Sequence, residues 1–500
     1  MTCHEGLENY PNNPRLKELA KRLSKPQISS QQVDGGKADP LPMEIITKLQ
    51  DLRDKNEANL LLKKCFELVE KYNKSALLWH FVGCAHLTKG QSIQAEAAFR
   101  KVIELDPTNF AAHTNLGNAL KDLERFKEAE EMHKIARNLN PLIASPQINL
   151  GSVYEELARY EDSFECFSKA VSLDPECSLA KYNLGAANLR VKNFVEGWRL
   201  RETRWLGGAS IEGCDPIKTS KPLWDGSSVD RLYVWSEQGI GDEVMFASCF
   251  DDLTEKCNQL IVACSPRLRT LFQRSFQNKI EFVDREKGLC DEDFDFQVPA
   301  QTATGLVRQN LEDFNLAAPA YLNPDPIVVE NVRQSLERMS DGRPIIGLSW
   351  LSKNDRFGKK RSISLSELVS AIPKDYMLVN LQYGDVKDDL RTVQKKLKRS
   401  VATFDDIDNW KDLDLFAGLI QACDKVVSID NSTVHFAGAL DKECHVLLPI
   451  STDWRWGLQN ETSSYWYNSL VLHRQLALND WSGAITSLTS TLGKNSPSVH

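Results

Sequence analysis

Residues 144–177 read ASPQINLGSVYEELARYEDSFECFSKAVSLDPEC, and their pattern of glycine, alanine, aromatic and proline residues recurs along the chain. One constant interval separates successive members of two series, the glycines Gly83, Gly117, Gly151 and Gly185 and the prolines Pro107, Pro141 and Pro175. Glycine lets two helices approach closely, and proline ends the second helix because it cannot donate a backbone hydrogen bond. The pattern therefore predicts stacked pairs of antiparallel helices, each burying its apolar face against its neighbours.

This interval is the period of tetratricopeptide repeats, which form an α-solenoid that we expect over residues 42–205. The predicted units are 76–109, 110–143, 144–177 and a partial unit over 178–205. Gly197-Trp198 replaces the usual start of the second helix in the partial unit, which predicts a junction there. Such an array usually offers a groove to a protein partner, although a purely structural or dimerising role stays open.

Composition limits the other classes of function. A chain of 500 residues with 42% hydrophobic residues can form more than one core, and a net charge of −8 makes nucleic acid a poor partner. We find neither a basic and apolar leader nor an apolar run of membrane-spanning length, so we expect no integral membrane segment and a cytoplasmic location. Residues 1–41 are predicted to be a mobile leader and 491–500 a tail.

The C-terminal region alternates short apolar runs with helix-length segments, a pattern typical of parallel α/β sheets. The predicted strands are Leu232–Trp235, Leu260–Cys264, Ile280–Val283, Ile345–Ser349, Met377–Leu381, Lys425–Ile429 and His445–Leu448. The proline-rich stretch Leu316–Ile327 divides them into two Rossmann-like lobes, 206–318 and 319–490. A ligand is expected in the cleft at the carboxyl ends of these strands.

Two turns in this region carry candidate chemistry. In the first lobe, Gly239 and Gly241 let the backbone approach a ligand, and Asp242 lies at the start of a helix. A dinucleotide site would use similar glycines, but the next strand ends at Cys264-Ser265 and lacks an acidic residue for a ribose. The alternative role for Asp242 is to cap its helix.

The second turn follows the strand that ends at Ile429. Asp430 and Asn431 lead into a helix whose N-terminal residues, Ser432 and Thr433, offer free N–H groups and hydroxyls to a diphosphate. His435 falls in the first turn of that helix, where a histidine held by its neighbours is the alternative to a functional one.

Several segments resemble bacterial glycosyltransferases that contain tetratricopeptide repeats and are related to the ADP-heptose:lipopolysaccharide heptosyltransferases. They are Ser236–Asp242, Gly347–Trp350, Arg361–Ile363, Leu381–Gly384, Asp430–Leu440 and Asp453–Trp456. The resemblance implies a GT-B pair of lobes and an inverting, metal-independent hexosyl- or heptosyltransferase. It implies a nucleotide-diphosphate sugar as co-substrate, with no other cofactor, and a protein or glycan as acceptor. A looser kinship with O-linked N-acetylglucosamine transferases favours a protein acceptor, although their His-Gly-Asn turn is absent.

Carried onto this sequence, the resemblance makes Asp242 the catalytic carboxylate and His435 a second catalytic residue, which contacts the donor. The residues expected to bind the donor are Gly239, Gly241, Ser349, Lys353, Arg361, Gln382, Asp430, Asn431, Ser432 and Thr433. In the expected mechanism Asp242 accepts the proton of an acceptor hydroxyl, while the helix terminus and a cation from the Lys353–Arg361 segment stabilise the leaving diphosphate. Heptosyltransferases commonly have glycine where this chain has Asn431 or Ser432.

Other candidates have simpler explanations. The paired aspartates Asp293/Asp295, Asp406/Asp408 and Asp412/Asp414 are interpreted as surface or capping carboxylates, and no metal site is predicted. Four aromatic residues could stack on a sugar or a base, but at this density they are expected to form core between the lobes: Trp454, Trp456, Trp466 and Tyr467. A scaffold that binds proteins through its repeats and has lost catalysis remains the alternative function.

Overall fold

The computed structural model describes residues 41–206, 216–276, 280–287, 289–316, 318–354, 358–404 and 406–494. Within these ranges the chain forms two units. The N-terminal unit runs to Ala187 and also includes residues 200–206, and the C-terminal unit comprises Asn188–Arg199 and the described residues from 216 onward. The leader expected over 1–41 lies outside the described residues apart from Leu41.

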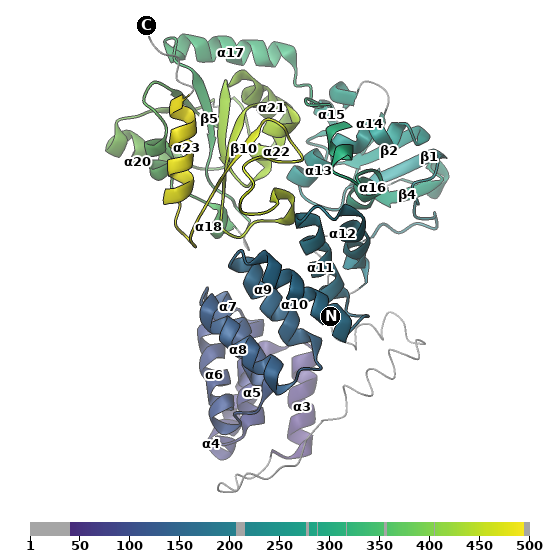
Figure 1. The fold of residues 1–500 in the computed structure, drawn as a ribbon, viewed down its shortest axis with the longest axis vertical. Coiled ribbons are helices and arrows are strands. Elements are labelled where there is room, and N and C mark those ends of the chain that lie inside the picture. Colours follow the sequence, from purple (N-terminus) through teal and green to yellow (C-terminus); the bar gives the residue numbers. More distant parts are fainter. Residues whose placement is uncertain are drawn as a thin grey trace. The chain divides into compact units, whose positions relative to one another are not determined.

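The N-terminal unit is built from consecutive helices that pack in antiparallel pairs (Figure 1). These helices are α3 (Met43–Asp54), α4 (Ala58–Tyr72), α5 (Ala76–Thr88), α6 (Ser92–Leu105), α7 (Phe110–Asp122), α8 (Phe126–Leu139), α9 (Ala144–Glu156), α10 (Tyr160–Leu173) and α11 (Ser178–Arg190). Each predicted repeat over 76–177 forms one pair, and its proline lies in the turn that follows the second helix of the pair. Helix α12 (Phe194–Arg201) and the 3-10 turn η1 (Glu202–Trp205) follow α11.

The repeat glycines are needed because an aromatic ring lies directly against them. A Cβ atom on Gly151 would lie 2.6 Å from the Phe167 ring, closer than real side-chain contacts permit. In the preceding repeat the equivalent ring is that of His133, which would lie 2.5 Å from a Cβ on Gly117. His133 is fully buried, and neither of its ring nitrogens has a hydrogen-bond partner among the described residues. A polar ring thus occupies a position that its neighbouring repeat fills with phenylalanine.

We therefore expect His133→Phe to raise the free energy of unfolding by about 1–3 kcal/mol, the cost of leaving buried polar groups unsatisfied. Burial lowers the pKa of His133 from 6.5 to about 3. Between these values the unfolded chain binds more protons than the folded chain, so the wild type loses stability as the pH falls below 6.5. The gain from His133→Phe should grow as the pH is lowered, which urea denaturation at pH 7.5 and pH 5 measures.

The reciprocal change, Phe167→His, is the matched control because it places the same polar ring against Gly151. It should destabilise the protein, with a larger loss at pH 5 than at pH 7.5. A His133→Phe variant that is less stable than the wild type, or whose gain does not depend on pH, would contradict this explanation.

The C-terminal unit contains two parallel sheets. The first has the strand order β3-β2-β1-β4, and its central strands are buried at their carboxyl ends. Its strands are β1 (Val229–Trp235), β2 (Cys257–Cys264), β3 (Ile280–Asp284) and β4 (Phe296–Pro299). Its helices are α13 (Ile240–Phe246), α14 (Phe250–Thr254), α15 (Arg269–Phe276) and α16 (Ala300–Val307). The turn between β1 and α13 therefore lies at the carboxyl edge of this sheet.

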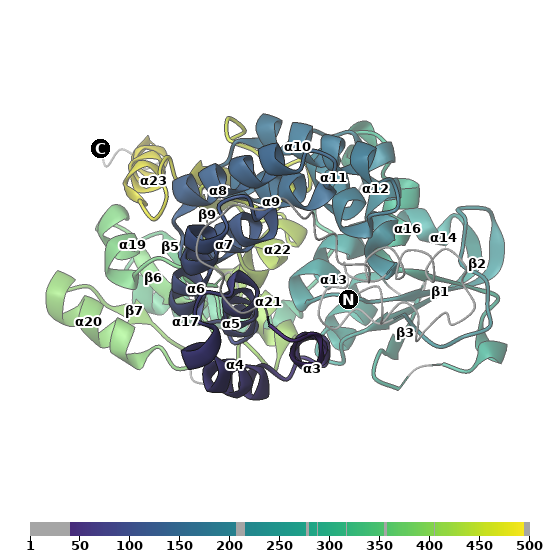
Figure 2. The ribbon, with the colours of Figure 1, turned by 90° about the horizontal axis from the view of Figure 1, so that it is seen from below.

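The second sheet has the order β10-β9-β8-β5-β6-β7, and every pair in it is parallel. Its strands are β5 (Ile345–Ser349), β6 (Met377–Asn380), β7 (Val401–Ala402), β8 (Lys425–Ile429), β9 (Cys444–Leu448) and β10 (Leu470–Arg474). Its helices are α17 (Pro326–Ser340), α18 (Gly358–Arg361), α19 (Leu365–Ala371), α20 (Lys387–Leu397), α21 (Leu413–Ala422), α22 (Ser432–Ala439) and α23 (Ser482–Lys494). Figure 1 shows α23 on one side of the sheet and α22 on the other, and Figure 2 shows α20 beside the edge strand β7.

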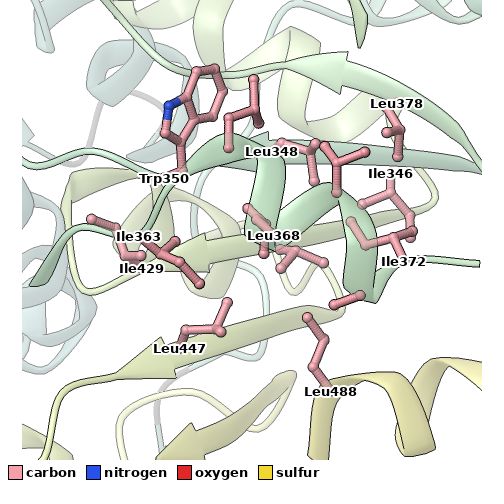
Figure 3. Close-up of a cluster of buried hydrophobic side chains, with 14 of the residues drawn as sticks. Ile346, Leu348, Trp350, Ile363, Leu368, Ile372, Leu378, Ile429, Leu447 and Leu488 are labelled. Atoms are coloured by element: carbon pink, nitrogen blue, oxygen red, sulfur yellow. The ribbon is translucent and has the colours of Figure 1, made fainter. Parts of the chain in front are cut away.

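A continuous apolar core fixes this second sheet. Leu348, Ile429 and Leu447 from three adjacent strands pack against Leu368 of α19 and Leu488 of α23 (Figure 3). All five side chains are almost completely buried. Because consecutive parallel strands require helical crossovers, helices cover both faces and the polar turns are left at the strand ends.

The predicted parallel α/β architecture is confirmed, but three strands were missed. Strand β4 includes Gln297 and Pro299, β7 has two residues, and β10 ends in His473 and Arg474. None of them forms the uninterrupted apolar run that indicates a buried strand. Their pairing with β1, β6 and β9 is decided by the neighbouring strand. Helix α23 also continues to Lys494, beyond the expected lobe boundary at residue 490.

Candidate active site

The turn after β1 meets the N-terminus of α22. Gly239 is the N-cap of α13, and Asp242 lies in the first turn of that helix. A Cβ atom on Gly241 would lie 2.9 Å from Cδ2 of His435 and 3.5 Å from Cα of Ser432. A larger residue would force the two turns apart, so glycine at 241 permits this close approach. The structure therefore brings together the two turns that the sequence singled out.

The Asp242 carboxylate forms an ion pair with Arg455, in which Nη2 of Arg455 lies 2.8 Å from Oδ1 of Asp242. Burial raises the pKa of Asp242 above its ordinary value, and the carboxylates of Asp453 and Asp430 act in the same direction. Arg455 opposes this increase. A carboxylate with a raised pKa is a stronger base, and the guanidinium fixes its orientation.

The N-terminus of α22 is held by a buried polar network. The Asn431 side chain caps the helix, because its Oδ1 accepts a hydrogen bond from the Thr433 backbone N–H at 3.0 Å. Its Nδ2 donates to the Ser349 hydroxyl at 2.8 Å, and the Thr433 hydroxyl donates to the same oxygen at 3.2 Å. Ser349 in turn donates to Oε1 of Gln382 at 3.1 Å. The network thus joins residues at the carboxyl ends of β5, β6 and β8.

Two atoms in this region have unused hydrogen-bonding capacity. Nε2 of Gln382 and Oδ2 of Asp430 are buried without a hydrogen-bond partner among the described residues. Oδ2 of Asp430 lies 3.3 Å from Nε of Arg361, so charge pairing compensates part of its burial. Lys353 is exposed, with Nζ 5.4 Å from the centre of the Tyr383 ring. Arg361 of the predicted basic segment thus reaches Asp430, which follows β8.

His435 is a neutral, hydrogen-bonded ring. It is 3% exposed, its Nδ1 lies 3.0 Å from the Tyr467 hydroxyl, and its ring stacks on Trp456 at a centroid distance of 5.8 Å. Burial, together with the charge of Arg455, lowers its pKa from 6.5 to about 3. At neutral pH His435 therefore offers a hydrogen-bonding edge and no positive charge.

Sequence reasoning missed Arg455 and Tyr467 as site residues. Arg455 lies in the Asp453–Trp456 segment, which resembles known transferases, but that resemblance gives this arginine no role. Tyr467 was interpreted as core, and it is buried, as are Trp454 and Trp456. The core interpretation of these aromatic residues is thus confirmed, but it did not show that the Tyr467 hydroxyl contacts His435.

The paired aspartates make structural contacts, as expected. Asp295 pairs with Arg231 at 2.8 Å, and Asp414 pairs with Arg274 at 2.6 Å. Asp412 caps α21 by accepting a hydrogen bond from a backbone N–H. These carboxylates therefore have structural partners of their own.

Comparison with known proteins identifies the repeats. Models described as tetratricopeptide repeat match residues 76–109, 98–131 and 144–177. The chain is 30% identical over 298 residues to protein FlbA of Caulobacter vibrioides, an alignment that covers 55% of this chain and 48% of FlbA. It is 38% identical over 74 residues to protein O-mannosyl-transferase TMTC3 of Homo sapiens, covering 15% of this chain and 8% of that protein. The chain thus spans half or less of the length of the curated relatives it matches.

Similar solved structures cover a third of the chain. MamA from Desulfovibrio magneticus RS-1 has 23% identity and a TM-score of 0.28, over 32% of this chain and 89% of MamA. Pseudomonas aeruginosa PilF has 18% identity and a TM-score of 0.31, over 34% of this chain and 77% of PilF. Among the described helices, none has both the length and the apolar character needed to cross a membrane. The matched models and the helix pairs agree that residues 76–177 are tetratricopeptide repeats.

Proposed function

We propose that the C-terminal unit is a glycosyltransferase of the GT-B type that moves a sugar from a nucleotide-diphosphate donor to a protein or glycan acceptor in the cytoplasm. The observation that carries this proposal is the meeting of the Asp242 turn with the N-terminus of α22. Asp242, the candidate base, follows Gly241 directly in the first lobe. The candidate diphosphate site, the N-terminus of α22 in the second lobe, lies against Gly241. The resemblance to heptosyltransferases, and the match to a protein named as an O-mannosyl-transferase, support the same class of reaction.

The donor half of the proposed site is suited to a diphosphate. The N-terminus of α22 carries the partial positive charge of the helix dipole, and Ser432 is its first residue. Arg361 supplies a full positive charge close to Asp430. The unused N–H group of Gln382 can donate to a phosphate or sugar oxygen. These features favour an anionic donor whose pyrophosphate lies near the end of β8.

The proposed reaction is a displacement at the anomeric carbon. The acceptor oxygen attacks this carbon while Asp242 takes the hydroxyl proton, and the bond between the carbon and the diphosphate oxygen breaks. The electron pair leaves with the nucleoside diphosphate, whose charge is stabilised by the α22 terminus and Arg361. Arg455 keeps Asp242 oriented toward the acceptor. The configuration at the anomeric carbon inverts, in line with the heptosyltransferase resemblance.

In this proposal the tetratricopeptide repeats engage the acceptor or a partner protein. The alternative is a protein-binding scaffold without catalysis, which is favoured by the fact that Asp242 and His435 already have partners in Arg455 and Tyr467. Both functions use the repeats as an interaction module. They differ in whether the C-terminal unit binds a nucleotide sugar and transfers its sugar.

Thermal denaturation of the full chain with a panel of nucleotide sugars tests the proposal. A cognate donor should raise the melting temperature of the wild type and of Asp242→Asn alike, because Asp242 acts on the acceptor. The same donor should raise the melting temperature of Arg361→Met by a smaller amount. A stabilising donor carrying a labelled sugar is then incubated with the protein and cell lysate. No stabilisation by any donor, or binding without transfer, would favour the scaffold.

A further inference from the structure

The segment Asn188–Arg199 belongs to the C-terminal unit. It contains the last residues of α11 and most of α12. Two of its side chains, Arg190 and Trp198, contact the loop Thr452–Gly457. That loop carries Arg455, the ion-pair partner of Asp242.

Arg190 is bound to this loop mainly through the loop's backbone. Its Nη2 donates to the Thr452 carbonyl at 2.8 Å, and its Nη1 donates to the Gly457 carbonyl at 3.3 Å. Nη1 also lies 3.3 Å from the Thr452 hydroxyl and 3.4 Å from the Asp453 carbonyl. Arg190 is only 3% exposed, and burying a guanidinium is costly unless acceptors meet its N–H groups. Here one loop supplies those acceptors at both of its ends.

Trp198 contacts the same loop from a second position. Its ring meets the Trp454 ring edge to face at a centroid distance of 5.3 Å, and its Nε1 donates to the Arg308 carbonyl at 2.8 Å. Arg455 leaves the loop between the two ends that Arg190 holds. The direction in which Arg455 extends is therefore set by the backbone that Arg190 anchors.

We propose that Arg190 is a positioning residue, which fixes the Thr452–Gly457 loop so that Arg455 pairs with Asp242. The orientation of the Asp242 carboxylate then depends on a side chain from the last helix that follows the repeat pattern. The catalytic consequence rests on the proposed function, whereas the dependence of the Asp242–Arg455 pair on Arg190 does not.

A double-mutant cycle on the full chain tests that dependence without an activity assay. The melting temperatures of Arg190→Met, Asp242→Asn and the double variant are compared with that of the wild type. The loss in the double variant should be smaller than the sum of the two single losses, because Arg190→Met already weakens the pair that Asp242→Asn removes. Arg199→Met, an exposed arginine of the same segment that pairs with Glu196, should combine additively with Asp242→Asn. Additive losses for Arg190→Met would overturn the proposal.

Transfer kinetics test the catalytic consequence. Arg190→Met should lower kcat by about ten- to a hundredfold, the usual effect of a small misplacement of a catalytic group, with the donor KM within about twofold of the wild type. If Arg190→Met does not fold, Arg190→Lys replaces it in both tests, because lysine keeps the charge but lacks the fork that reaches both carbonyls. Arg199→Met should transfer like the wild type. An unchanged kcat would overturn the proposal. If the double-mutant cycle shows coupling between Arg190 and Asp242 but the protein transfers no sugar, only the proposed function is refuted.

Discussion

Asp242→Asn should lower kcat by about 10²- to 10⁴-fold, the contribution that a positioned general base usually makes. Asparagine keeps the shape of the side chain but cannot accept the acceptor's proton. The affinity for the donor should change little, because the proposed donor contacts come from the α22 side of the site. Steady-state kinetics with a labelled donor measure kcat, and calorimetry measures the donor's dissociation constant.

The control is Asp295→Asn, which removes a carboxylate of the same lobe that also pairs with an arginine, Arg231. It should transfer like the wild type. In the wild type, the rate of transfer should rise with pH as Asp242 loses its proton. The midpoint of this rise should lie above pH 3.8, because burial raises the pKa of Asp242. If Asp242→Asn keeps its full kcat while remaining folded, Asp242 is not the base.

Arg455→Met should destabilise the protein by about 3 kcal/mol, near the lower end of the range for breaking a buried ion pair. The loss arises because Asp242 keeps its charge in a buried environment after its partner is removed. The lower end applies because the Asp242 side chain is still 20% exposed. Denaturant unfolding of the full chain, followed by tryptophan fluorescence, measures this change.

Adding Asp242→Asn to Arg455→Met should restore part of the lost stability, because the double variant no longer buries an unpaired carboxylate. The matched pair Arg231→Met and Asp295→Asn should show weaker coupling, because both of its side chains are about one-third exposed. Equal coupling in the two pairs would contradict a special role for burial at Asp242.

Some elements could be read directly from local sequence. The constant interval between the repeat glycines and prolines placed the helix pairs over 76–177, because glycine and proline act on the backbone of their own segment. Strands β5 and β8 were predicted with the bounds observed, since Ile345–Ser349 and Lys425–Ile429 are short apolar runs of buried strands. Strand β7 could not be predicted, because two residues carry no periodicity.

Only part of the candidate site could be predicted from the sequence. Asn431, Ser432 and Thr433 were expected at a helix N-terminus, and they lie there because strand, polar turn and small-residue helix follow each other directly in the sequence. The roles of Arg455 and Arg190 depend on contacts between distant parts of the sequence, Arg455 with Asp242 and Arg190 with the Thr452–Gly457 loop. A local sequence pattern does not predict contacts of this kind.

The sequence by itself determined the repeats, the parallel α/β layers and the two polar turns, because periodicity, glycine and proline act over short stretches of backbone. Only the tertiary structure decided that Asp242 meets the start of α22, that Arg455 pairs with it, and that Arg190 holds the loop of Arg455. These contacts depend on how the two sheets and the segment Asn188–Arg199 pack. That packing is determined by the shape and burial of surfaces that are distant in the sequence.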